Sequence, residues 1–153
     1  MRNTEFTPII QEIESFVTSG ATRSEILLNT CKLLKDKVYH YDWVGFYLLD
    51  EQHSNLVLDS YVGKSTEHTL IPVGKGVCGQ VAESSKLKIV QDVSQEGNYI
   101  ACSIDVQSEI VVPILKGGKF VAEIDIDSHS PSPFTPDDEK FLTSVCQKLS
   151  VLF

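Results

Sequence analysis

The sequence predicts an α+β fold, in which a central antiparallel sheet carries the N- and C-terminal helices packed on one face. Two observations support this class. Helical periodicity dominates both ends of the chain, and the strand-like segments between them are joined by turns rather than by regular βα alternation. The chain has 153 residues, enough for one domain with a sizeable core. Since no repeat or linker divides it, we expect a single domain spanning residues 1–153.

Apolar residues recur at helical spacing near each end of the chain. The first such segment ends at the SGA break, and Thr22 with Glu25 then has the spacing of a capping box that opens a second helix. Near the C-terminus, Thr135 and Pro136 provide an N-cap and a first-turn proline for a final amphipathic helix. The sequence therefore predicts two leading helices and one closing helix.

Two hairpins are predicted between these helices. Residues 43–49 and 56–62 are rich in aromatic and branched side chains and flank the polar turn EQHSN. Residues 109–115 and 120–127 flank KGGK, whose glycines accept the positive φ that tight turns require. We therefore expect two antiparallel strand pairs in the sheet.

The segment between the hairpins is less regular. Glycines interrupt every period over residues 63–79, so we expect an irregular segment there. The stretch VCGQVAES then suits a short helix, LKIVQDV suits a strand, and a further loop carries Cys102.

Composition and charge exclude several classes of function. The net charge of −8 opposes binding to phosphate backbones, so nucleic acid is not an expected partner. No window approaches the roughly 18 consecutive apolar residues of a membrane span, and the N-terminus has no signal-peptide pattern, so we expect a cytoplasmic protein without a membrane partner. The four cysteines lie far apart without a CxxC pair, which argues against a zinc finger or a disulfide scaffold.

Three carboxylates share one face of the last predicted strand. Period-two geometry places Glu123, Asp125 and Asp127 together, and Glu109 lies on the hairpin partner of that strand. A solvated sheet face explains this pattern equally well. If loops cover the face instead, burial and crowding raise at least one carboxyl pKa, and a neutral acid can lie beside an ionised neighbour. Such a pocket suits a small zwitterion.

Two of the cysteines are candidate reactive thiols. Cys102 lies in a loop between small residues, and Cys78 lies where a short helix begins, a position that favours thiolate. The alternative for each is an inert small side chain. Cys31 and Cys146 fall on apolar helix faces and are predicted to belong to the core.

Aromatic residues and a histidine complete the candidate site. Trp43 and Tyr47 are four residues apart on one strand and therefore share a face, where they suit either a core or an aromatic pocket wall. A zinc site built from His68, Cys78, Cys102 and the carboxylates has no short ligand spacing to support it. We therefore predict neither a metal nor a cofactor.

Taken together, WVGFYLL, IPVGKGVCG, the IAC around Cys102, SEIVVPI and DIDS resemble the GAF-domain family of free methionine-(R)-sulfoxide reductases. The similarity spans about residues 43–128. It implies a GAF fold, consistent with the element order above. It also implies a substrate site formed by Glu109, Asp125, Asp127, Trp43 and Tyr47.

The resemblance further implies a cysteine mechanism. Cys102 matches the family's nucleophile, which attacks the sulfoxide sulfur while a protonated Glu109 or Asp127 donates to the departing oxygen. The product is methionine and a sulfenic acid on Cys102. Cys78, as a substitute resolving thiol, would then form a disulfide for a thioredoxin-type reductant to open. A homodimer is the expected assembly.

The sequence departs from the family pattern at the resolving position. Members usually carry a cysteine ten residues before the GVCG cysteine, and this chain has His68 there. Glu123 also adds a carboxylate where members usually have a smaller or apolar residue. The alternative function is therefore a stand-alone GAF module that binds a small ligand or senses redox state without turnover.

Overall fold

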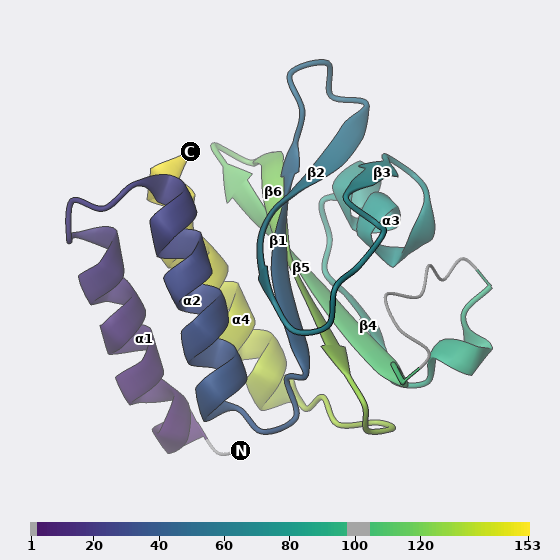
Figure 1. The fold of residues 1–153 in the computed structure, drawn as a ribbon, viewed down its shortest axis with the longest axis horizontal. Coiled ribbons are helices and arrows are strands. Elements are labelled where there is room, and N and C mark those ends of the chain that lie inside the picture. Colours follow the sequence, from purple (N-terminus) through teal and green to yellow (C-terminus); the bar gives the residue numbers. More distant parts are fainter. Residues whose placement is uncertain (1–2, 98–104) are drawn as a thin grey trace.

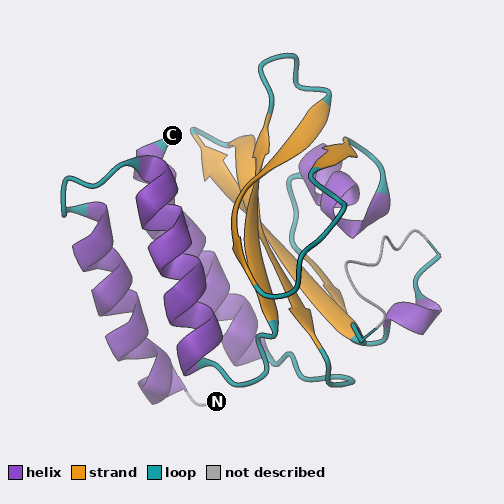
Figure 2. Cartoon of the chain, viewed as in Figure 1, coloured by secondary structure: helices purple, strands orange, loops and turns teal. Residues whose placement is uncertain are grey.

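The computed structural model describes residues 3–97 and 105–153, which form one sheet with helices on both faces (Figures 1 and 2). The helices, in chain order, are α1 (Asn3–Val17), α2 (Arg23–Lys37), α3 (Gly76–Ser84) and α4 (Pro136–Leu149). The strands are β1 (Trp43–Leu49), β2 (Asn55–Val62), β3 (Leu70–Pro72), β4 (Lys88–Val90), β5 (Ser108–Lys116) and β6 (Lys119–Ser128). Short 3₁₀ turns at Val93–Gln95 and Ser150–Leu152 complete the described elements.

The six strands run in the order β3-β2-β1-β6-β5-β4, and each neighbouring pair is antiparallel. Both predicted hairpins are present, as β1–β2 and β5–β6. The first and last strands of the hairpins meet in the centre of the sheet, because β1 also pairs with β6. The predicted α+β class with an antiparallel sheet is confirmed.

Apolar side chains form a separate core on each side of the sheet. Helices α1, α2 and α4 pack on one face, where β6 contributes Ala122, Ile124 and Ile126 to the larger core (Figure 1). Helix α3 lies on the opposite face, over a smaller cluster that includes Val77, Val81 and Cys78. The terminal helices therefore share one face as predicted, and the candidate site lies on the other.

The helix starts follow from local hydrogen bonds. The capping box that opens α2 is present, with Glu25 N–H donating to Thr22 Oγ1 at 3.2 Å and the Glu25 carboxylate accepting from the Thr22 backbone N–H. A second capping box opens α4, where Thr135 and Asp138 exchange the same two bonds. Both starts were predicted from Thr22 and Thr135.

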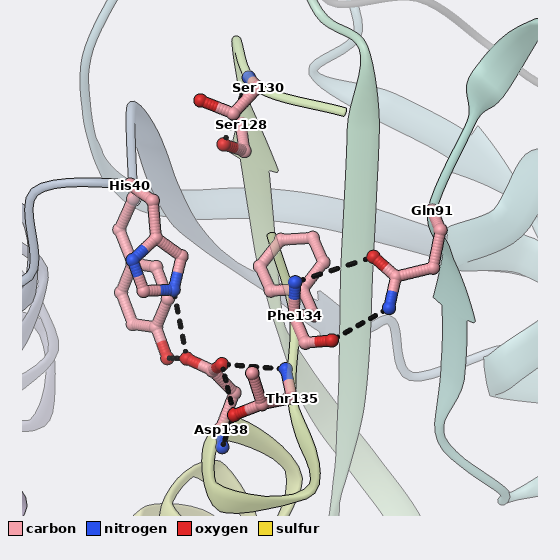
Figure 3. Close-up of polar contacts among 8 residues, drawn as sticks. His40, Gln91, Ser128, Ser130, Phe134, Thr135 and Asp138 are labelled. Carbon is pink, nitrogen blue, oxygen red and sulfur yellow. Dashed lines mark hydrogen bonds and ion pairs between the residues drawn. The ribbon is translucent and has the colours of Figure 1, made fainter. Parts of the chain in front are cut away.

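A buried polar network fixes the start of α4 to the start of the sheet (Figure 3). Asp138 Oδ1 accepts from the hydroxyl of Tyr41 at 2.6 Å and lies 3.0 Å from His40 Nε2. Nearby, the side-chain amide of Gln91 pairs with both backbone groups of Phe134. Burial raises the pKa of Asp138, but the hydrogen bonds from His40 and Tyr41 outweigh it and hold that pKa below its usual range. The carboxylate therefore stays ionised inside the protein.

The structure differs from the prediction mainly between the hairpins. Residues 70–72, expected to be irregular, form β3 at the edge of the sheet, where a terminal proline is tolerated because its missing N–H faces away from the ladder. The strand expected over LKIVQDV is shorter and ends at Val90, because Asp92 then caps a 3₁₀ turn by accepting from Ser94 N–H. None of the helices in the described ranges combines the length and hydropathy that crossing a bilayer demands.

Candidate active site

The register of the three central strands sets the positions of the carboxylates. Asp127 lies directly between Glu109 on β5 and Trp43 on β1. Two residues along β6, Asp125 lies between Val111 and Gly45. Alternate residues of a strand point to the same side, so these carboxylates face away from α1, α2 and α4.

All four carboxylates of this face are buried. The exposed fraction is 3% for Glu109, 0% for Glu123, 1% for Asp125 and 0% for Asp127. Helix α3 and the chain between β2 and β3 lie on this side of the sheet (Figure 1). A solvated acidic face, the alternative interpretation of the sequence, is therefore wrong.

Two aromatic side chains fasten the covering loop to the sheet. The indole N–H of Trp43 donates to the backbone carbonyl oxygen of Lys64 at 3.0 Å. The hydroxyl of Tyr47 donates to the backbone carbonyl oxygen of His68 at 2.7 Å. The two rings stack with centroids 6.5 Å apart. Gly45 makes room for this, because a Cβ atom there would overlap the six-membered part of the Trp43 ring. Trp43 and Tyr47 thus hold the loop over the carboxylates.

A small cavity lies beneath this cover, at the start of α3. Its volume is about 10 Å³, and its lining includes Tyr47, His68, Lys75, Cys78, Glu109 and Asp125. This volume holds about one water molecule. A ligand as large as an amino acid therefore requires the cover to move.

The predicted substrate residues are divided between two cavities. Trp43 and Asp127 line a second, larger space of about 280 Å³ together with Lys64 and His129. The single pocket expected from the sequence, with the carboxylates and both aromatic rings around one substrate, therefore stays a prediction. Tyr47 lines the smaller cavity and Trp43 the larger one, and their two rings stack against each other.

Cys78 lies at the first turn of α3 against the carboxylates, with its Sγ 4.0 Å from Glu109 Oε2. Burial raises the pKa of this thiol well above its ordinary value, and the charges of Asp125, Glu123 and Glu109 raise it further. The sequence suggested a helix N-terminus that favours thiolate. Desolvation and three acidic neighbours oppose that effect, so Cys78 is a neutral thiol at pH 7.

Two carboxyl groups of the face have raised pKa values. Burial raises the pKa of Glu123 well above its ordinary value, and the charge of Asp125 adds to the effect. Burial also raises the pKa of Asp125. Both carboxyl oxygens of Glu123 lack a hydrogen-bond partner among the described residues, and so does Oδ1 of Asp125. Burial thus favours the neutral form of Glu123 and Asp125, whereas the family resemblance assigned the proton-donating role to Glu109 or Asp127, which stays a prediction.

Two of the remaining three cysteines lie in the larger core, and the third lies outside the described residues. Cys31 and Cys146 are buried in the larger core as predicted, and burial raises the pKa of both thiols. Cys102, the predicted nucleophile, lies outside the described residues. Its role therefore stays a prediction.

Sequence reasoning did not place two residues that line the small cavity, Ile71 and Lys75. Both come from the segment expected to be irregular. The signal that would have found Ile71 is the short segment TLIP, which is too brief to separate from a loop; no sequence signal pointed to Lys75. Glu123 was placed on the acidic face but given no role at the site, and it proves to lie at the base of the cluster around Cys78.

These features define a class of protein, an antiparallel α+β domain with a small polar site enclosed between its sheet and a covering helix and loop. The chain belongs to the GAF domain family, because residues 22–152 match the sequence pattern of that domain. A GAF domain-containing protein A from Dictyostelium discoideum is 35% identical over 145 residues, which cover 95% of this chain and 90% of that protein.

Proteins named as free methionine-R-sulfoxide reductases are also similar over nearly the whole chain. Free methionine-R-sulfoxide reductase from Escherichia coli is 33% identical over 150 residues, covering 97% of this chain and 89% of that enzyme. The X-ray structure of free methionine-R-sulfoxide reductase from Neisseria meningitidis in complex with its substrate superposes with a TM-score of 0.91 at 34% identity, covering 97% of this chain and 87% of that one. The resemblance inferred from the sequence motifs is confirmed.

Proposed function

We propose that this protein is an oxidoreductase that converts free L-methionine-(R)-sulfoxide to methionine. One observation carries the proposal: Glu109, Asp125 and Cys78 converge on a buried cavity beneath a loop fastened by Tyr47. The similarity to enzymes named for this reaction supports it.

The acidic face suits the substrate. An ionised carboxylate among Glu109, Asp125 and Asp127 binds the ammonium group, while a neighbouring neutral carboxyl protonates the sulfoxide oxygen. The raised pKa of Asp125 supports the presence of a proton at this site. Trp43 and Tyr47 provide the apolar wall for the methyl and methylene groups.

The chemistry we propose is an oxygen transfer to a thiol. The sulfur of Cys102 attacks the sulfoxide sulfur and forms an S–S bond while the neutral carboxyl protonates the oxygen. Transfer of the resulting hydroxyl to the Cys102 sulfur then breaks the S–O and S–S bonds, leaving a sulfenic acid on Cys102 and free methionine. Cys102 loses two electrons and the sulfoxide gains them. Cys78 then displaces water from the sulfenic acid, and a thioredoxin-type dithiol reduces the resulting disulfide.

Burial of Cys78 limits the resolving step. A neutral, buried thiol is a weak nucleophile. We therefore expect resolution to be slower than the attack by Cys102 and to depend on opening of the cover. The homodimer expected from the sequence also stays a prediction.

A second candidate function is a GAF module that binds a small ligand without turnover. It is favoured by His68, which lines the cavity where the related enzymes usually carry a resolving thiol. His68→Cys separates the two functions, because position 68 borders the cavity that contains Cys78. Restored or accelerated turnover with thioredoxin supports the reductase. If neither wild type nor His68→Cys forms methionine, the binding module is the better description.

A further inference from the structure

Three side chains of types that commonly bind metals meet at the small cavity, each from a different helix or strand. One donor atom each from Cys78 on α3, Glu109 on β5 and Asp125 on β6 lies within 4.8 Å of the other two. All three residues are buried. Ligands around one tetrahedral Zn²⁺ ion, with bonds of about 2.0–2.3 Å, lie slightly closer than this. A small contraction of side chains would therefore suffice for all three to bind one ion.

Asp125 provides an independent sign of a ligand. Its side chain is 1% exposed, it lines the cavity, and Oδ1 has no hydrogen-bond partner among the described residues. A buried carboxyl oxygen without a partner is costly. A bound cation would satisfy this oxygen directly.

The size of the cavity points to an ion. A volume of about 10 Å³ holds one water-sized species and no organic molecule. His68 lines the same cavity and offers an imidazole as a fourth ligand, and Lys75 at its margin is exposed. The cavity as it stands therefore fits a single cation better than it fits an amino acid.

We propose that Cys78, Glu109 and Asp125 bind one thiophilic divalent cation of the Zn²⁺ type. A donor set of one sulfur and two carboxylates selects Zn²⁺ or Co²⁺ over Mg²⁺ and Ca²⁺, which prefer oxygen alone. This site does not depend on the proposed reductase activity. If the protein is the proposed reductase, the cation binds the same carboxylates as the substrate ammonium group and makes the resolving thiol unavailable. Cation and sulfoxide therefore compete for the site.

Cation binding must release the thiol proton of Cys78, because the thiolate is the metal ligand. The surrounding carboxylates that disfavour thiolate in the metal-free site favour the cation itself. Affinity is therefore expected to rise with pH.

The test uses Co²⁺, which has visible absorption and a sulfur-to-metal charge-transfer band. It is added to the reduced Cys102→Ser protein without sulfoxide or electron donor, so its outcome is independent of turnover. We expect one Co²⁺ per subunit and a thiolate band. Adding Cys78→Ser should remove the band, whereas adding Cys146→Ala, a matched buried cysteine outside the site, should preserve it.

The carboxylates are tested by isosteric variants. Outer-shell partners of metals are typically worth 10–100-fold in affinity, so removing a ligand by Glu109→Gln or Asp125→Asn should weaken Co²⁺ binding by at least about tenfold. Circular dichroism verifies folding of each variant. Absence of the band in Cys102→Ser protein, its persistence after Cys78→Ser, or unchanged affinity in both folded carboxylate variants overturns the proposal.

Discussion

Cys78 and Glu109 face each other across the site, with the thiol sulfur 4.0 Å from a carboxylate oxygen although one lies on a helix and the other on a strand far along the chain. Burial and three acidic neighbours raise the pKa of the thiol. The pair therefore places a proton-bearing thiol directly beside a buried carboxyl group. Reaction at this thiol requires the covering loop and α3 to move, so that substrate can enter the small cavity.

Cys78→Ser tests the resolving role of this thiol. We expect the variant to form about one methionine per subunit and then stop with a sulfenic acid, because no second thiol completes the disulfide. The measurement is methionine formed with thioredoxin as reductant, together with trapping of the sulfenic acid. Undiminished multiple turnover in the variant would show that an external thiol resolves Cys102.

Glu123 makes stability depend on pH in a predictable direction. Its pKa is raised in the folded protein, so the folded state retains a proton that the unfolded chain loses above its ordinary pKa of about 4.3. Stability from this group is complete below that pH and declines as pH rises toward the folded pKa. The decline for one group reaches at most about 1.4 kcal/mol per pH unit.

Glu123→Gln should flatten this decline. Urea unfolding between pH 4 and pH 8 measures it, and Glu51→Gln, an exposed position, serves as the matched control with an unchanged slope. Equal slopes in wild type and Glu123→Gln would show that Glu123 is ionised in the folded protein.

Much of this architecture was predictable because it is local. The capping boxes at Thr22 and Thr135 and the KGGK turn each depend on neighbouring residues, and period two alone placed Asp125 and Asp127 on one face. β3 was not predictable, because three residues ending in Pro72 form a strand only when β2 offers its edge. Nor was the contact of Cys78 with the carboxylates, which depends on where α3 packs.

Gly45→Ala tests the packing that seats Trp43. The added methyl group would overlap the Trp43 ring, so the ring must move and release its bond to Lys64. We expect a cost of about 1–3 kcal/mol, typical of overpacking. Trp43 is the single tryptophan of the chain, so its fluorescence reports the movement without interference. Gly97→Ala, where a Cβ meets no atom, should change neither quantity; an unaltered Trp43 spectrum in Gly45→Ala would contradict the packing described.

Asp138→Ala tests the buried network beside the sheet. It removes the N-cap partner of Thr135 and leaves His40 and the hydroxyl of Tyr41 unpaired, so we expect a loss of about 3 kcal/mol or more. The neighbouring Asp137→Ala, in the same helical turn, should cost less than about 1 kcal/mol. Because the pKa of Asp138 is lowered, its stabilisation is present above pH 4 and is lost as pH falls further. Similar unfolding free energies for the two variants would contradict this role.

The most direct measurement of the proposed function is methionine released per subunit when fully reduced protein meets free methionine sulfoxide without added reductant. The account predicts about one methionine per subunit from the R epimer, none from the S epimer, and none with Cys102→Ser. It also predicts a large loss of rate in Glu109→Gln, because both ammonium binding and proton transfer use this cluster. Absence of methionine from folded wild-type protein with free Cys102 thiol would contradict the reductase and leave a ligand-binding GAF domain.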